Sequence, residues 1–241
     1  MRTALILSLA VVTVVTAPSQ SRLSGGTEPR APASETWQPL DRWLEVTGCP
    51  FPTESWTIVD GCLEAVANPN GMQDLRTVDT YRSFDLRFEW KIAKGANSGV
   101  KYLVQRTDRW QRPGETGFQA RARGLEYQIL DDAANPDAKN GTSRMTAALY
   151  SIYPPVRHLA DTDVWHRSRI LVDGDHVEHW LDDVKMLEYD LKQPEVAAAL
   201  RSLRTQNGKQ PGLEVLHESP ISLQNHGGGV WFHKLQVRRL P

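Results

Sequence analysis

Strict alternation of apolar and charged residues marks one stretch of the chain, Phe84–Lys91, which reads FDLRFEWK. Aromatic and aliphatic residues occupy every second position, and acidic and basic residues fill the positions between them. A period of two is that of a β-strand with one face in a hydrophobic core. The opposite face is charged, so it is either a solvated exterior or the floor of a polar binding groove.

Ten further short runs have the composition of strands, and turn residues separate them. The pairs Asp60-Gly61, Asp173-Gly174 and Asp182-Asp183 predict tight hairpin turns. Many short antiparallel strands predict an all-β sandwich of two sheets, or jelly roll, and argue against a parallel α/β fold. The ten runs are Trp56–Val59, Cys62–Val66, Gly99–Gln105, Gly124–Leu130, Ala147–Ile152, His166–Val172, His176–Leu181, Val184–Tyr189, Ile221–Gln224 and Val230–Arg238.

One segment, Pro194–Leu203, has the pattern of a short helix instead. A proline and an acidic residue open it, basic residues follow, and its apolar residues at 196, 199, 200 and 203 form one stripe. We expect a structural helix that caps an open end of the sandwich and ends at Asn207-Gly208.

The N-terminus differs from the rest of the chain. Arg2 is followed by the apolar run Ala4–Val15, which is too short to span a bilayer. We predict a signal peptide over residues 1–19 and therefore a periplasmic or secreted protein; the alternative is an uncleaved anchor. Residues 20–36 are polar and rich in small residues, which predicts a disordered linker. Residues 37–241 then form a single jelly-roll domain.

The charge and the cysteine content of the chain indicate which kinds of partner and which cross-links to expect. Its 241 residues carry a formal net charge of -1, so no basic surface for nucleic acid is expected, nor any membrane contact once the signal is cleaved. The oligomeric state is not encoded in an obvious way. The two cysteines, Cys49 and Cys62, predict a disulfide worth about 3 kcal/mol in an exported protein. Two separate thiols are the alternative, and a metal site built on them is disfavoured.

The most suggestive polar residues lie in Gly124–Asp132. Alternation places Glu126 and Gln128 on one face and the apolar residues between them on the other. Asp131 follows two apolar residues, so it reaches the face of Glu126 only through a bulge.

Two further features could bind a ligand. The oxygen-rich loop Asp131–Asp137 could hold a divalent cation, although a solvated turn explains it as well because its spacing matches no metal loop. Trp110 could stack on a sugar ring. Phosphate-binding glycine loops, nucleophile-elbow serines and zinc signatures are missing from the sequence, which favours acid–base sugar chemistry or plain binding.

Several separated motifs resemble the 3-keto-disaccharide hydrolase family of exported bacterial proteins, from about Trp37 to Leu240. The resemblance implies a concanavalin A-like jelly roll that cleaves glycosides already oxidised at carbon 3. His166 and Asp182 depart from the asparagines usual in the family, and Asn225 departs from the usual aspartate. The motifs are Phe84–Lys91, Asn97–Val100, Glu126–Asp132, Ala148–Tyr150, Trp165 with Arg169, His179–Asp182, Ile221–Gly227 and Trp231-Phe232.

The resemblance implies a base, an acid and a donor to an enolate oxygen, because a ketone at carbon 3 acidifies the proton on carbon 2. We favour Glu126 and His226 as the proton-transfer pair and Lys101 as the enolate partner, with Glu89 as a further acid or base. The strand face of Lys101 stays open, because it alternates with Val100 and Tyr102 but a bulge at Gly99 would shift the register. The expected substrate-binding residues are Asn97, Gln128, Tyr150, Gln224, Lys91, Asp131 and Trp110.

Other functions remain open from the sequence. A non-catalytic carbohydrate-binding module of the same fold is the main alternative, and a laminin-G-like structural domain is a more distant one. Glu126–Asp131 also resembles the catalytic strand of laminarinase-type glucanases. Gln128 and the shorter Asp131 disfavour ordinary retaining hydrolysis, which needs two carboxyl groups about 5 Å apart. Glu89 and Lys91 could also form a cross-strand ion pair.

Overall fold

The computed structural model describes residues 36–68, 71–157, 161–206 and 213–241. The predicted signal peptide and nearly all of the linker lie outside these residues. The strands are β1 (Gln38–Pro39), β2 (Trp43–Glu45), β3 (Trp56–Val59), β4 (Cys62–Ala65), β5 (Leu75–Thr77), β6 (Phe84–Ile92), β7 (Asn97–Trp110), β8 (Gln119–Leu130), β9 (His166–Asp173), β10 (His176–Leu181), β11 (Val184–Asp190), β12 (Ser222–Leu223) and β13 (Val230–Arg239). The helices are η1 (Pro136–Asn140), η2 (Thr142–Arg144) and α1 (Pro194–Thr205).

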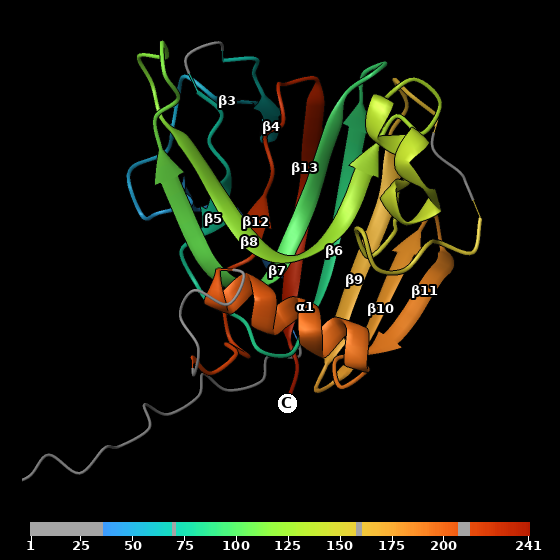
Figure 1. Cartoon of the computed structure of the whole chain (residues 1–241). Coiled ribbons are helices and arrows are strands. Elements are labelled where there is room, and N and C mark those ends of the chain that lie inside the picture. The colour runs from blue at the N-terminus through green and yellow to red at the C-terminus, as the bar shows by residue number, and fades with distance from the viewer. Residues whose placement is uncertain (1–35, 69–70, 158–160, 207–212) are drawn as a thin grey trace, which may run out of the picture. The chain divides into compact units, whose positions relative to one another are not determined.

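The strands form two antiparallel sheets packed face to face. The larger sheet has the order β11-β10-β9-β6-β13-β4-β3, with β1 paired to β13, and the smaller has the order β2-β5-β12-β7-β8. Figure 1 shows the long curved hairpin of β7 and β8 in front of the larger sheet, with α1 across its lower end. The predicted concanavalin A-like sandwich with one short helix is therefore confirmed.

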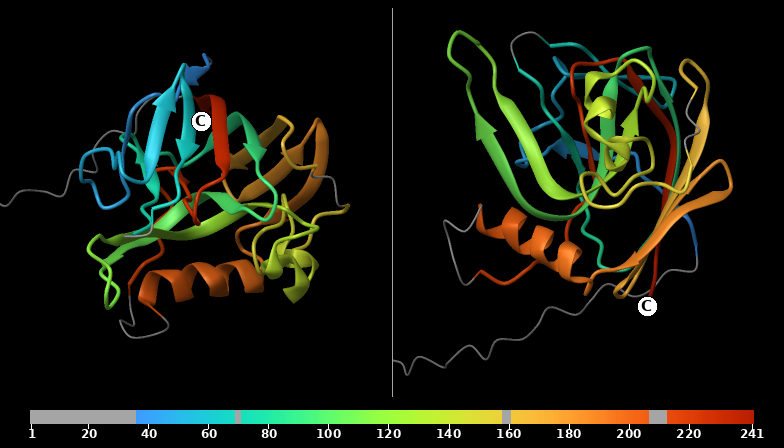
Figure 2. Two further views of the ribbon diagram at one scale, coloured as in Figure 1. Left: turned by 90° about the horizontal axis from the view of Figure 1, so that it is seen from above. Right: turned by 45° about the vertical axis from the view of Figure 1, so that its right-hand side comes forward.

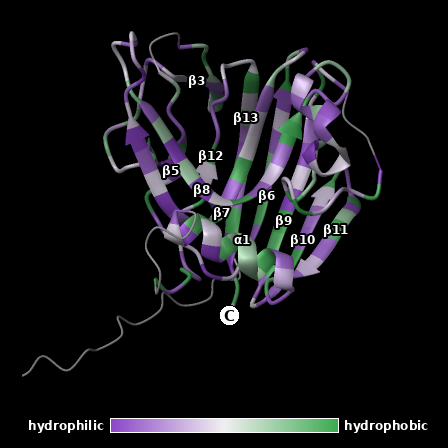
Figure 3. Cartoon of the chain, viewed as in Figure 1, coloured by the Kyte–Doolittle hydropathy of each residue, from purple (hydrophilic) through white to green (hydrophobic). Residues whose placement is uncertain are grey.

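Aromatic side chains fill the space between the sheets. Phe88 and Trp90 of β6, and Tyr102 and Tyr127 of β7 and β8, are at most 2% exposed. The ring centroids of Phe88 and Tyr127 lie 5.8 Å apart in an edge-to-face arrangement. In Figure 3, green and purple segments alternate along strands of the larger sheet, as expected for strands with one buried face. The charged residues of β6 consequently point away from the core.

The turn predictions are confirmed. Asp60 and Gly61 both have positive φ between β3 and β4, and Asp182 and Asp183 do so between β10 and β11. Two successive left-handed residues give the turn whose twist matches a hairpin.

Two parts of the strand prediction are wrong. Ala147–Ile152 forms turns instead of a strand, although its backbone still bonds to the edge of β8: Ala147 N–H donates to the Gln128 carbonyl at 2.8 Å and Tyr150 N–H to the Glu126 carbonyl at 3.0 Å. Three very short strands, β1, β2 and β5, have no clear pattern in the sequence. Tertiary pairing creates them, because two or three residues are too few to show a period.

The predicted helix is confirmed as α1, which buries Val196 and Leu200. It ends at Thr205, where Gln206 adopts a left-handed conformation; the expected stop at Asn207-Gly208 lies outside the described residues. Seen from above in Figure 2, α1 lies on the outer side of the β7–β8 hairpin. No helix in the described part of the chain is long and apolar enough to cross a membrane.

The predicted disulfide is not formed in this structure. Cys49 lies exposed in the loop after β2, and Cys62 begins β4 in the other sheet; both are free thiols. Each sulfur atom instead lies near an oxygen atom. Cys49 Sγ is 3.8 Å from Thr47 Oγ1, and Cys62 Sγ is 3.9 Å from the Leu63 carbonyl.

Candidate active site

A cavity of about 1230 Å³, with both polar and apolar lining residues, lies on the outer face of the β7–β8 hairpin. Residues of α1 form one wall, the segment around η1 and Tyr150 forms another, and a glycine-rich loop after β12 closes a third. Seven of the predicted site residues line it: Asn97, Lys101, Glu126, Gln128, Tyr150, Gln224 and His226. The structure thus gathers residues from four separate parts of the sequence.

Lys101 and Glu126 form the centre of the site because they are direct cross-strand partners on β7 and β8. Lys101 Nζ lies 3.8 Å from Glu126 Oε2. The register is regular from Asn97 to Tyr102, so Lys101 reaches this face by ordinary alternation and not through a bulge at Gly99. Gly99 has a different role: a Cβ there would lie 2.5 Å from Glu126 Oε1. Glycine at this position therefore makes room for the carboxyl group.

The environment of Glu126 favours its protonated form. Burial raises the pKa of this carboxyl group, while the Lys101 ammonium opposes the rise and the Asp74 carboxylate adds to it. Gln128, with its amide nitrogen turned toward acceptors, donates to Glu126 Oε1 and to the Ser98 carbonyl, each at 3.1 Å. Glu126 is thus a carboxyl group held in a fixed place with a raised pKa.

Asp74 is the buried anchor of the cavity floor. Its carboxylate, fully buried, accepts from Lys101 Nζ at 3.2 Å and from Arg121 Nη1 at 2.7 Å. The backbone N–H groups of Ala122 and Asn225 also donate to it, at 3.1 and 3.2 Å. Four donors around one buried carboxylate fix its position, and through it they fix the ammonium of Lys101.

The loop that carries His226 is held by the side chain of Asn225. Its nitrogen donates to the carbonyls of Ser55 and Val66, and its oxygen accepts from the N–H groups of Gly227 and Gly228. An aspartate could not donate to the two carbonyls, so asparagine suits this site. Gly228 has φ +86, and a Cβ there would lie 2.6 Å from the Ala67 nitrogen, so the loop requires glycine.

His226 reaches the cavity from this loop with an exposed side chain. Loss of solvation lowers the pKa of its imidazole, and the Arg121 guanidinium lowers it further. Lys101 acts in the same direction, and Asp74 opposes both. The pKa values of Glu126 and His226 are therefore shifted in opposite directions, a pattern typical of a general acid and a general base.

The wall opposite His226 positions Tyr150. Its hydroxyl donates to Asp137 Oδ2 at 2.9 Å and accepts from Arg144 Nη1. Burial and the bond to Asp137 raise the pKa of Tyr150 to about 12, so it stays a neutral phenol. Gln224 has a buried Oε1 atom with no protein donor among the described residues. Gln224 itself lines the cavity.

Glu89 and Lys91 do not belong to this site, and the expectation that they share a groove with Glu126 is wrong. Both lie on the outer face of the larger sheet, because their neighbours Phe88 and Trp90 face the core. Glu89 Oε1 pairs with Lys234 at 3.1 Å. The Lys91 ammonium instead lies 4.6 Å from the centroid of the Trp231 ring.

Asp131 and Trp110 also lie apart from the cavity lining. The register near the end of β8 has no bulge, and Asp131 does not join Glu126 in the cavity. Its carboxylate instead accepts from the N–H groups of Gly95, Ala133 and Ala134 at 2.6, 3.0 and 3.1 Å. These bonds anchor the loops beside the cavity. Trp110 ends β7, with the Arg123 guanidinium 5.9 Å from its ring centroid.

The family departures at His166 and Asp182 also lie outside the cavity lining. His166 Nδ1 lies 2.7 Å from Asp182 Oδ2, so the two departures contact each other.

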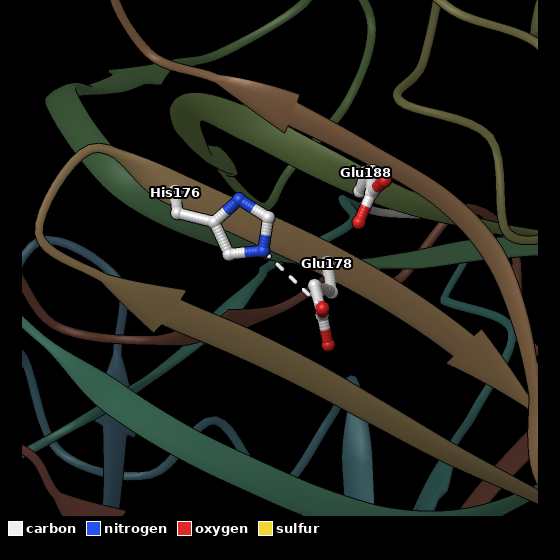
Figure 4. A group of neighbouring side chains, drawn as sticks. All are labelled: His176, Glu178 and Glu188. Carbon is white, nitrogen blue, oxygen red and sulfur yellow. Dashed lines mark hydrogen bonds and ion pairs between the residues drawn. The ribbon is translucent and has the colours of Figure 1, made fainter.

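One group of possible metal ligands occurs among the described residues: His176, Glu178 and Glu188 on β10 and β11. Figure 4 shows the three side chains close together, with His176 bonded to Glu178. Lys185 already pairs with both carboxylates, at 3.4 Å and 2.5 Å. The group is an exposed ion-pair cluster, distant in sequence and in sheet from Glu126.

Two residues of the site carried no signal in the sequence. Asp74 stands alone before a three-residue strand, and Arg121 lies in a part of β8 beyond the predicted run. The predicted strand began at Gly124, but β8 begins five residues earlier, at Gln119. This N-terminal extension contains Arg121 and brings it to Asp74. The helix α1 was expected to be purely structural, yet Ala199, Ser202 and Leu203 line the cavity.

A carboxyl group, an ammonium and an imidazole around one cavity, with amide side chains beside them, form an acid–base site for a hydroxyl-rich ligand. On a two-sheet sandwich, this combination is suited to acid–base chemistry on a ligand bound in the cavity.

The chain belongs to the 3-keto-α-glucoside-1,2-lyase-like family, whose model matches residues 37–238. It is 32% identical over 203 residues to a 3-keto-disaccharide hydrolase from Bacteroides thetaiotaomicron. The alignment covers 77% of this chain and 70% of that protein. A crystal structure of a candidate glycosyl hydrolase from Parabacteroides distasonis has a TM-score of 0.64 and 24% identity, covering 83% of this chain and 89% of its own. A second such protein from that organism has a TM-score of 0.62 and 20% identity, covering 85% and 100%. The predicted family is confirmed, and it supports a glycoside hydrolase role.

Proposed function

We propose that this protein cleaves 3-keto glycosides by elimination followed by hydration. The observation that carries the proposal is the cross-strand pair of Lys101 and Glu126, 3.8 Å apart, in the same cavity as His226. The name of the relative from Bacteroides thetaiotaomicron supports a 3-keto disaccharide as the substrate class. The cavity volume of about 1230 Å³ exceeds the usual range of small-ligand pockets, so it has room for a sugar and its aglycone.

In the elimination step, neutral His226 accepts the proton from carbon 2 of the keto sugar. The electrons move toward the carbonyl oxygen on carbon 3, and the Lys101 ammonium stabilises the negative charge that develops there. The bond from carbon 1 to the aglycone oxygen then breaks, and Glu126 donates its proton to that oxygen. The products are an enone and the free aglycone.

In the hydration step, the roles of the two groups reverse. Glu126, now a carboxylate, accepts a proton from water as the oxygen adds to carbon 1. The His226 imidazolium returns a proton to carbon 2, which restores the ketone and the starting state of both groups. The directions of the two pKa shifts support this assignment, since the raised pKa of Glu126 favours an acid and the lowered pKa of His226 favours a base.

The remaining polar side chains would bind the sugar hydroxyl groups. Gln224, Asn97 and Gln128 offer amides, and the neutral Tyr150 borders the same space. We also propose that the protein is exported, on the strength of the apolar run Ala4–Val15 behind Arg2.

A chromogenic 3-keto glucoside, tested beside the unoxidised glucoside, distinguishes this function from the alternatives. We expect aglycone release from the keto substrate alone. Glu126→Gln and His226→Ala should each lower kcat by about 10²- to 10⁴-fold. Glu89→Gln and His233→Ala on the larger sheet are the matched controls and should leave kcat unchanged. Retention of wild-type turnover by the folded site variants would exclude these residues, and binding of a sugar without turnover would favour a lectin-like module.

A further inference from the structure

Arg121 lies behind the cavity and contacts the two elements that carry the proposed base and the proposed enolate partner. Its Nη1 atom donates to Asp74 Oδ1 at 2.7 Å and to the carbonyl of Asn225. The residue is 7% exposed and does not line the cavity, so it has no direct contact with a ligand bound there.

The carbonyl that Arg121 holds belongs to the residue just before His226. The next two peptide N–H groups of the loop, those of Gly227 and Gly228, are bound by the Asn225 side chain. Asn225 N–H bonds to the same Asp74 oxygen that accepts from Arg121. The guanidinium therefore fixes the backbone on the N-terminal side of His226, where the side chain of Asn225 makes no bond to the loop.

We propose that Arg121 is a positioning residue for His226: through the Asn225 carbonyl it clamps the backbone that carries the imidazole, and this contact fixes its positive charge at the residue just before His226. The proposal deepens the proposed function and rests on it for its catalytic consequence. A cation near an imidazole disfavours the imidazolium, and the exposure of His226 to solvent keeps this effect moderate. The clamp thus favours the neutral, proton-accepting form of the base.

Three charged groups on the elements packed against the His226 loop influence the pKa of its imidazole. Arg121 on β8 and Lys101 on β7 both disfavour its protonation, and Asp74 before β5 favours it. Arg121 is the larger of the two cationic influences. Lys101 in addition is paired with Asp74 at 3.2 Å and lies 3.8 Å from Glu126. Removing the charge of Arg121 should therefore raise the titration midpoint of His226.

Two substitutions separate the charge of Arg121 from its geometry. Arg121→Gln removes the charge and leaves Asp74 with Lys101 and two backbone donors, so that carboxylate keeps three of its partners. Arg121→Lys keeps the charge as a compact ammonium on a shorter side chain, without the planar guanidinium whose Nη1 donates to both Asp74 and the Asn225 carbonyl. Arg167→Gln is the matched control, because Arg167 is an exposed arginine of the larger sheet paired with Asp183.

The experiment is an NMR titration of the folded full chain, with the His226 signal assigned by its loss in His226→Ala. We expect a wild-type midpoint below the ordinary value of about 6.5. We expect an upward shift in Arg121→Gln, a midpoint close to wild type in Arg121→Lys, and no shift in Arg167→Gln. With a 3-keto glucoside, kcat should fall by up to about 10²-fold in Arg121→Gln, since the base is displaced as well.

Two results would overturn the proposal. One is a wild-type midpoint at or above the ordinary histidine value, which decides the matter even if Arg121→Gln does not fold. The other is a folded Arg121→Gln variant whose His226 midpoint equals that of wild type. The titration needs no substrate, so an absence of turnover in the wild type would refute the proposed function while leaving this test intact.

Discussion

Replacing Gly99 by alanine displaces the side chain of Glu126, the proposed acid, and leaves its carboxyl group in place as a chemical group. The new Cβ would lie 2.5 Å from Glu126 Oε1 and 2.9 Å from Glu126 Cγ, where ordinary van der Waals contact begins at 3.4 Å. The carboxyl group must therefore move by about 0.9 Å. A displacement of about 1 Å in a catalytic group can cost about 10²-fold in rate, so we expect kcat to fall between about 10- and 100-fold.

Stability should change much less than activity in this variant. The nearest atoms belong to the end of a flexible side chain and not to backbone, so we expect the free energy of unfolding to change by about 1 kcal/mol or less. Urea unfolding measures this, and aglycone release from a 3-keto glucoside measures kcat. In a Glu126→Gln background, Gly99→Ala should have little further effect on kcat. A folded Gly99→Ala protein with wild-type kcat would refute the reasoning.

Three further predictions concern the groups around the site. Asp74→Asn leaves two buried cations without their carboxylate and should cost about 3 to 5 kcal/mol in urea unfolding, while a loss below about 1 kcal/mol would contradict the role of Asp74 as an anchor. Asp131→Ala should cost about 1 to 3 kcal/mol at neutral pH. Burial raises the pKa of Asp131, but bonds from three backbone N–H groups lower it overall, so its contribution is present above the ordinary aspartate pKa and is lost as pH falls through the folded pKa. The deficit of Asp131→Ala relative to wild type should accordingly shrink in acid, and a deficit independent of pH would argue against this account. Tyr150→Phe should raise KM about fivefold with little change in kcat, and an equal loss in kcat would instead assign Tyr150 to the chemistry.

Most of the correct predictions came from the alternation of apolar and polar residues along single strands. It placed Glu126 and Gln128 on one face, and the register of β7 and β8 brings Lys101 directly opposite Glu126. Hairpin turns were predictable because two successive positive φ angles demand particular residues, as at Asp60-Gly61. Local rules of this kind need no knowledge of which strands become neighbours.

The errors arose where the answer depends on the pairing of distant strands. Glu89 has the same alternation as Glu126, yet β6 lies in the larger sheet and turns Glu89 to the opposite side of the molecule. Asp74 and Arg121 could not be predicted, because their ion pair joins segments 47 residues apart. The strands β5 and β8 are not neighbours in the smaller sheet, and the two segments meet at an isolated bridge between Gln73 and Ala120. Asp131 was wrongly predicted to bind substrate. Its carboxylate accepts hydrogen bonds from backbone N–H groups of a loop, and such bonds have no signature in the sequence.

The fate of the hydrogen on carbon 2 tests elimination most directly. We would let the protein cleave a 3-keto glucoside in D₂O and analyse the released keto sugar by mass spectrometry and NMR, with free keto sugar incubated alone as the control for spontaneous exchange. Elimination and hydration predict one deuterium at carbon 2 of the product, introduced during turnover and strongly reduced in His226→Ala. Aglycone release with hydrogen retained at carbon 2 would contradict the account and indicate direct displacement at carbon 1.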